Sequence, residues 1–386
     1  MGKGGSETHS DPSEYTTNFN LHVGYGFAPG NKITDWFITC IPISLLISGL
    51  VHFPLYIRNS DTNGASKMDV IEAVHWSVVY TILIVCIFFM VKYSHIYAEI
   101  DRMIRSGVYD YGDDFTEEQY SLRDETNRIV IKLRKLLTIA FTISVSSSLT
   151  KQTIFRRKPG SWNTPFKGWT PFVIDSWPRF IAVTIYHCTI TANTGICAYL
   201  FVLCFLTFGI HLGGHLKILR IAIRNVFVQN GQTEQQTLAK LKKCTEHHLQ
   251  IKRLFHLVQI YSGKSSGILP IGSVGMICTF VYDMTGENSK VDVSVMVLLP
   301  EAGIITMYAL IGQYITDESE KVWDCFYEID WYSQPVPVRK HLLMMMVATK
   351  KSMDTKGFGV FKYSLEGLKE IMQTTYTFYN TLKATR

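Results

Sequence analysis

Residues 180–210 read FIAVTIYHCTITANTGICAYLFVLCFLTFGI and contain no Asp, Glu, Lys or Arg. In a bilayer, about 20 uncharged helical residues cross a hydrocarbon core of about 30 Å, because a helix satisfies its own backbone hydrogen bonds. A water-soluble fold would need polar faces within such a block. The stretch therefore predicts a transmembrane helix.

The rest of the chain repeats this pattern. Hydrophobic residues make up 47% of the sequence and charged residues 18%, and the apolar residues are gathered in blocks. Such blocks predict six further spans at 33–57, 70–91, 136–150, 254–282, 293–315 and 358–382. The expected fold class is an all-α membrane protein with seven transmembrane helices.

Three of these spans carry unusual features. The span 136–150 ends in hydroxyl residues, so protein or a cavity should surround its outer end. Gly263, Gly267 and Pro270 are expected to bend the span 254–282. The span 358–382 carries Lys and Glu residues early and Thr residues later, so it should lie inside a bundle and away from lipid.

The distribution of basic residues predicts the orientation, because Lys and Arg are retained on the cytoplasmic side. With the amino terminus in the cytoplasm, the cytoplasmic segments hold 24 Lys and Arg residues and the outer segments hold 11. The basic run at 156–158 opposes this trend because it falls outside. We therefore expect a cytoplasmic amino terminus and an extracellular carboxyl terminus.

The cytoplasmic segments are expected to be helical as well. The stretch 212–254 reads as a helix that continues beyond the membrane. In the stretch 317–348, Val322, Cys325 and Phe326 fall on one face together with Ile329. Such faces could bring subunits together as an intracellular anchor.

Motifs near the carboxyl end form an ordered series. They are GQYITDES at 312–319, Tyr327, Trp331, Arg339-Lys340, SLE at 364–366 and TYTFY at 375–379. In this order and spacing they resemble the insect odorant receptor family. The resemblance covers the chain from residue 312 onward, and the expected span count and orientation agree with it elsewhere.

The resemblance implies a function. Family members are subunits of tetrameric, odorant-gated, non-selective cation channels in the plasma membrane of sensory neuron dendrites, where a tuning subunit assembles with a shared co-receptor. This chain lacks the long extra cytoplasmic segment between the fourth and fifth helices that is typical of the co-receptor, so it resembles a tuning subunit. Phe378-Tyr379 reverses the usual aromatic order of the family, which leaves the identity of the pore-facing residues open.

The resemblance also implies a domain organisation and a set of partners. The regions are a cytoplasmic segment 1–32, an odorant-binding bundle 33–315, a cytoplasmic anchor 316–357, and a pore-lining helix with the carboxyl terminus 358–386. The expected partners are a small volatile ligand, the co-receptor and membrane lipid, but no nucleic acid. Neither an enzyme active site nor a cofactor nor a metal site is expected.

The family places the odorant in the outer half of the bundle, between the second, third, fourth and sixth helices. The residues expected there are Ser77, Tyr80, Thr81, Ile143, Ser147, Thr150, Phe180, Thr184, His187, Val293, Met296 and Val297. A mostly apolar wall with a few hydroxyls favours a small volatile held by shape and dispersion, with one hydrogen bond to an ester, alcohol or aldehyde oxygen. Ordinary helix packing is the alternative for each residue.

The last span is the expected lining of the pore. A buried polar group without a partner costs roughly 1–3 kcal/mol, and a row of threonines avoids this cost by facing water. The candidates are Thr374, Thr377, Phe378, Thr381 and Leu382. The alternative is that these hydroxyls bond back to the helix carbonyls and only pack. Glu301, inside the sixth span, could likewise form a structural hydrogen bond or couple the pocket to the pore.

Other classes of protein remain alternatives. A G-protein-coupled receptor would have an outer amino terminus and an acidic-Arg pair after the third span, whereas Asp101-Arg102 follows the second. A transporter would have paired broken helices, for which Pro270 and Pro300 are the only hints. A gustatory-type receptor channel is the nearest relative, and its usual terminal motif is not matched at Thr375-Tyr376.

Overall fold

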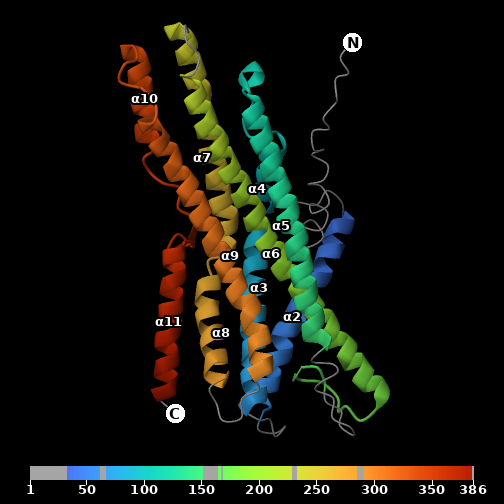
Figure 1. Cartoon of the computed structure of the whole chain (residues 1–386). Helices are drawn as coiled ribbons and strands as arrows, with labels where there is room; N and C mark the ends of the chain where they lie inside the picture. Colours follow the sequence, from blue (N-terminus) through green and yellow to red (C-terminus); the bar gives the residue numbers. More distant parts are fainter. Residues whose placement is uncertain are drawn as a thin grey trace, which may run out of the picture.

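The computed structural model describes residues 33–60, 67–150, 164–166, 168–227, 233–284 and 291–384. Over these residues, long helices run side by side as an elongated bundle with one small hairpin (Figure 1). The elements are α2 (Ile33–Arg58), α3 (Lys67–Lys92), α4 (Ser94–Arg105), η2 (Gly112–Asp114), α5 (Glu117–Thr150), α6 (Trp177–Asn225), α7 (Glu234–Ser265), α8 (Leu269–Met284), α9 (Val291–Asp324), η4 (Cys325–Tyr327), α10 (Val336–Thr349), β1 (Lys356–Gly357), β2 (Phe361–Lys362) and α11 (Leu365–Ala384).

Three helices carry the clearest apolar blocks. Within the described residues, the stretches Cys40–Arg58 of α2, Asp69–Lys92 of α3 and Trp177–Asn225 of α6 are long and apolar enough to cross a membrane by length and composition. They coincide with the predicted blocks at 33–57, 70–91 and 180–210. Of the other predicted spans, 136–150 and 293–315 fall within α5 and α9, whereas 254–282 and 358–382 overlap the α7–α8 pair and α11.

Helix α6 lies at the centre of the bundle. Of its most apolar stretch, 72% is buried, compared with 33% for α2 and 39% for α3. It contacts α5, α7 and α9 along its length, as well as α2 and α3. The high burial explains why its block is apolar on all sides and carries no polar stripe.

Glycines allow two neighbours to approach α6 closely. A Cβ atom added at Gly209 would overlap Ile311 of α9, and one added at Gly213 would overlap the Tyr314 ring of the same helix. On another side of α6, a Cβ atom at Gly214 would come 2.7 Å from Thr126 of α5. Small residues one turn apart are the usual means of close helix contact in membranes.

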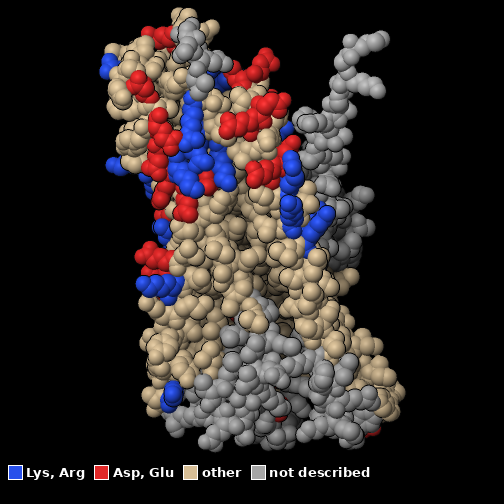
Figure 2. All heavy atoms as spheres, in the orientation of Figure 1, with Lys and Arg blue, Asp and Glu red and all other residues tan. Residues whose placement is uncertain are grey.

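Charged side chains gather at one end of the bundle. Figure 2 shows Lys, Arg, Asp and Glu over the half that holds α4, α7, α10 and the start of α5, and few of them on the other half of this face. In the charged half, the buried carboxylate of Glu318 on α9 bonds to Arg220 of α6 at 3.4 Å and to Lys321 at 2.8 Å. Glu318 therefore joins α9 to α6 through an ion pair in this half.

The charged half also has an apolar and aromatic core. Val322, Cys325, Phe326 and Ile329 are all buried, as their spacing predicts. Tyr111, next to η2, lies with its hydroxyl 2.8 Å from Nδ1 of His247 on α7. Burial lowers the pKa of His247 to about 3, so this ring is neutral at pH 7.

The predicted single helix over 212–254 is wrong in one respect. Helix α6 ends at Asn225, and α7 begins at Glu234. Thr233 caps α7 with a capping box, in which its side chain accepts from the backbone of Gln236 and the Gln236 side chain accepts from the backbone of Thr233. A local start signal of this kind therefore outweighs the apolar periodicity of the stretch.

The fifth predicted span is broken where glycine and proline were expected to bend it. Helix α7 ends at Ser265 and α8 begins at Leu269. The hairpin of β1 and β2 docks at this break, where the Phe358 amide donates to the Gly263 carbonyl at 2.9 Å. A Cβ atom at Gly267 would overlap the Phe358 ring. The absence of side chains at the break therefore makes room for the hairpin.

The predicted start of the last helix at residue 358 is wrong. Residues 356–362 form an antiparallel hairpin with Lys356 opposite Lys362, and α11 begins at Leu365. Phe358 and Gly359 have φ angles of 50° and 76°, which a right-handed helix excludes. The boundary expected at residue 316 falls inside α9, which continues to Asp324.

We expect Gly213→Ala to destabilise the bundle, because the added methyl group would have to displace the Tyr314 ring. The loss should be about 1–3 kcal/mol of unfolding free energy. Thermal unfolding of the detergent-solubilised protein measures it. Gly303→Ala in α9 is the matched control, since a Cβ atom there meets nothing within 4 Å. Equal unfolding temperatures for both variants would contradict close α6–α9 packing.

Candidate functional site

Two of the predicted pocket residues meet in a buried aromatic cluster. Tyr80 of α3 is 1% exposed and His187 of α6 is fully buried. The Tyr80 ring stacks on Phe53 of α2 at 5.7 Å, and its hydroxyl accepts a hydrogen bond from Thr194 at 3.1 Å. His187 Nε2 lies 3.0 Å from His52 Nε2, so one ring donates and the other accepts.

A loop segment closes this cluster. Phe166 is buried and packs edge-on against Trp76 at 4.9 Å and against His187 at 5.6 Å. The Trp169 amide donates to the His52 carbonyl at 3.3 Å. Phe166 and Trp169 therefore join α2, α3 and α6 into one aromatic unit.

The other predicted pocket residues are not gathered there. The Ser77, Thr81 and Thr184 hydroxyls each donate to a carbonyl one turn earlier in their own helix. Ile143 is 62% exposed, and Thr81 and Thr150 are also exposed. Ser147 and Phe180 are half-buried, and the side chains of Val293, Met296 and Val297 lie outside the described part of the chain.

A cavity of about 630 Å³ lies between α2, α6 and residues 169–172. Its walls include Ser44, Ile47 and Val51 of α2 and Val183 of α6. The Tyr186 hydroxyl donates to Ser48 Oγ at 3.1 Å on its border. None of the twelve predicted pocket residues lines it. The helical spacing of the α2 residues was a visible signal, but the contribution of the loop was not.

Helix α11 stands at the edge of the bundle and contacts α8 and α9 (Figure 1). Thr374, Thr377, Phe378 and Thr381 are exposed, whereas Thr375 is only 5% exposed. The three exposed threonine hydroxyls donate to the carbonyls four residues earlier, as the packing alternative expected. They are nevertheless not packed against the rest of the chain. The side chain of Leu382 lies outside the described part.

The face of α11 that points away from the bundle carries residues that the prediction missed. Glu366, Gln373 and Asn380 are exposed, while Thr375 lies on the packed side. Seven residues make nearly two helical turns, so these three side chains share one polar stripe. Their regular spacing was a signal available in the sequence.

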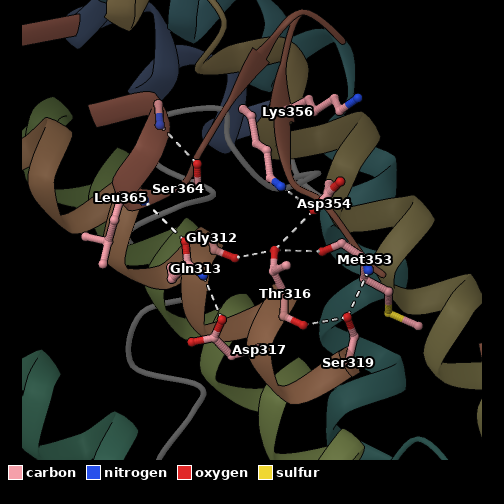
Figure 3. A network of polar contacts seen from close by, with 12 residues as sticks. Gly312, Gln313, Thr316, Asp317, Ser319, Met353, Asp354, Lys356, Ser364 and Leu365 are labelled. Atoms are coloured by element: carbon pink, nitrogen blue, oxygen red, sulfur yellow. Dashed lines mark hydrogen bonds and ion pairs between the residues drawn. The ribbon is translucent and has the colours of Figure 1, made fainter. Parts of the chain in front are cut away.

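A polar network ties the start of α11 to α9 (Figure 3). The Gln313 side chain accepts from the Leu365 amide at 3.3 Å and donates to Asp317 at 2.7 Å. The Gly367 amide donates to Ser364 Oγ at 3.1 Å, which caps the helix. One side chain of α9 therefore holds the first turn of α11.

The same network holds the hairpin. Thr316 Oγ1 lies 3.4 Å from the Met353 carbonyl and 3.4 Å from Asp354 Oδ1, and Asp354 pairs with Lys362 at 3.0 Å. The Met353 amide donates to Ser319 Oγ at 2.9 Å. These contacts give the motif at 312–319 a structural role at the junction of α9, β2 and α11 (Figure 3).

Glu301 has a partner inside the bundle. It is half-buried, and the Ser273 hydroxyl of α8 donates to its Oε1 at 3.0 Å. The carboxyl group therefore links α9 to α8, which in turn contacts α11.

A family model described as 7tm Odorant receptor matches residues 68–376, which is most of the chain. The chain belongs to the odorant receptor family. Among its relatives in Drosophila melanogaster, Odorant receptor 2a is 20% identical over 44% of this chain and 47% of its own length. Odorant receptor 85f is 21% identical over 52% of each chain. The chain thus spans about half the length of these curated relatives.

Solved structures share the fold of this odorant receptor. The insect olfactory receptor OR5 from Machilis hrabei, in complex with eugenol, has a TM-score of 0.80 and 13% identity and covers 97% of this chain and 100% of its own. A second structure of OR5 from Machilis hrabei has the same TM-score of 0.80 and 14% identity. This likeness confirms the predicted all-α, seven-helix membrane fold.

We expect Phe53→Ala to destabilise the receptor, because Phe53 is 1% exposed and packs against the rings of both Trp76 and Tyr80. The loss of unfolding free energy should be roughly 3 kcal/mol. Phe88→Ala in α3 is the control, since Phe88 is 60% exposed. Thermal unfolding of the two variants compares them. If both unfolding temperatures fall equally, Phe53 contributes no more to stability from within the aromatic cluster than Phe88 does from the surface.

Proposed function

We propose that this odorant receptor is the odorant-binding, tuning subunit of a ligand-gated, non-selective cation channel, assembled with a co-receptor as a heterotetramer in the plasma membrane of a sensory neuron dendrite. The observation that carries the proposal is the exposed polar stripe of α11. A helix with Glu366, Gln373 and Asn380 on its outer face is a poor neighbour for lipid. Copies of α11 around a water-filled path would give this stripe the solvent that it requires.

The proposal includes an orientation in the membrane and a subunit type. The charged half of the bundle (Figure 2) is the cytoplasmic half in this proposal, which agrees with the bias of Lys and Arg between loops. It leaves the carboxyl end of α11 outside. The connection between α6 and α7 covers only residues 226–233, which is too short for the extra segment typical of the co-receptor.

The ligand is a small volatile held in the outer half of the bundle. The structure of OR5 in complex with eugenol supports a small aromatic molecule as a ligand of this fold. In this chain, the predicted wall contains Tyr80 and His187, which lie in the buried aromatic cluster. Such a wall holds a ligand by shape and dispersion with few hydrogen bonds, so chain length and branching should control the response.

The proposal predicts currents that depend on two subunits and on no G protein. Co-expression of the chain with an odorant co-receptor should produce volatile-evoked cation currents, and neither subunit given alone should produce the same response profile. Patch-clamp recording against a panel of volatiles measures this. The currents should persist when G-protein signalling is blocked. Conductance that requires active G proteins would support the receptor-type alternative.

The proposal also predicts which α11 residues water reaches. Thr377→Cys and Thr381→Cys should react with a charged methanethiosulfonate reagent, faster with odorant than without, because the open path admits the reagent. Thr375→Cys is the control because Thr375 lies on the packed side of the same helix. Loss of odorant-evoked current reports the reaction. Protection of all three positions in both states would mean that α11 does not line a water-filled path.

A further inference from the structure

A groove of about 690 Å³ separates α8 from α11 below the hairpin. Its apolar wall includes Ile271 of α8, Val360 of the hairpin and Phe378 of α11, which are 58%, 76% and 56% exposed. The two helices contact each other and run in the same direction from the level of the hairpin (Figure 1). The groove is therefore open and follows the long axis of α11.

A carboxylate lies beside the apolar wall of this groove, near the hairpin. Glu370, Thr374 and Phe378 line it at intervals of four residues, which places Glu370 about 12 Å from Phe378 along the helix axis. Glu370 lies at the end next to the hairpin and Phe378 at the far end. An occupant with a polar head at Glu370 and an apolar body of similar length would reach Phe378.

The charge that remains unpaired in the groove is negative. Lys362 also lines the groove, but its ammonium group is paired with Asp354 at 3.0 Å. Within the described part of the chain, Glu370 takes part in no ion pair, and its side chain is exposed. A carboxylate beside an apolar wall favours a cation with an apolar body over a neutral or anionic molecule.

The floor of the groove is hollow at one position. Gly275 of α8 lines it, and a Cβ atom added there would meet nothing within 4 Å. A larger side chain at this position can therefore occupy the groove without displacing the backbone. The same glycine provides the space that a ligand would use.

We propose that the α8–α11 groove is a binding site for a cationic amphiphile, with its ammonium group on Glu370 and its hydrocarbon body along Ile271, Val274 and Phe378. The site is separate from the predicted odorant pocket, since none of the twelve pocket residues lines it. An occupant touches Thr374 and Phe378 directly, so it acts on α11 without passing through the pocket. The inference goes beyond the proposed function and stands without it.

The test uses the full-length chain, co-expressed with a co-receptor, with Ile271→Cys as a reporter in the groove and Phe88→Cys as a reporter outside it. Both side chains are exposed on apolar helices, at 58% and 60%. The probe is octylammonium, and 1-octanol is its neutral counterpart. The rate of modification by N-ethylmaleimide at each cysteine, followed by mass spectrometry of the peptides, reports occupancy. Octylammonium should slow the reaction at residue 271 and leave that at residue 88 unchanged.

Two variants connect the protection to the groove. Glu370→Gln should raise the half-protecting concentration of octylammonium about tenfold, the effect expected from the loss of one charge-assisted contact. Glu366→Gln, one turn earlier and outside the groove, should leave that concentration unchanged. Gly275→Phe should protect residue 271 without any probe.

Three results would overturn the proposal. Equal protection by octanol would identify the groove as a lipid site. Unaltered protection in Glu370→Gln would show that the carboxylate does not bind the ammonium group. A cysteine at residue 271 that is unreactive without any probe, while the one at residue 88 reacts, would mean that the groove is already covered.

Discussion

The close contact of α6 with α9 and α5 is the constraint on which the rest of the bundle depends. Lipid tails are as apolar as leucine, so helices in a membrane associate through close packing and polar contacts. Gly209 and Gly213 let α9 reach the backbone of α6, and Gly214 does the same for α5. Helix α9 then continues past the apolar half, where Glu318 joins it to Arg220 of α6. The α6–α9 contact therefore also sets the positions of the hairpin and α11, which attach to α9.

The last helix is the element that depends most on α9. Its first turn is held by Gln313, and the hairpin before it is held by Thr316 and by the break between α7 and α8. Beyond this base, α11 packs along one side and leaves its polar stripe exposed. A helix that is fixed at one end and packed on only one side can change its contacts with little repacking of the bundle. This arrangement suits the proposed role in opening an ion path and gives the α8–α11 groove direct access to that helix.

The prediction of individual elements succeeded where the chemistry is local. The apolar blocks at 33–57, 70–91 and 180–210 became α2, α3 and α6, because lipid requires each spanning segment to satisfy its own backbone. Gly267 and Pro270 correctly marked the place where the fifth span is interrupted. The start of α11 was missed, because residues 358–364 are apolar enough for a span while positive φ angles and distant contacts turn them into a hairpin. Among the described side chains, Tyr80 and His187 of the twelve predicted pocket residues share a cluster, whereas the others are not gathered there, because the faces of α3, α5 and α6 meet at angles that periodicity does not encode.

Composition and motif order were thus enough to identify a seven-helix membrane protein of the odorant receptor family, since span length, charge bias and the motifs from residue 312 onward are properties of short segments. The tertiary structure determined the contacts between segments that are far apart in the chain. Tyr80 and His187 share a cluster because Phe53, His52 and Phe166 close around them. The motif at 312–319 acts by contacting residues 353–365, which the bend of the hairpin brings beside it. Side-chain periodicity acts over a few turns, whereas such meetings depend on helix crossing and loop closure, which no local pattern specifies.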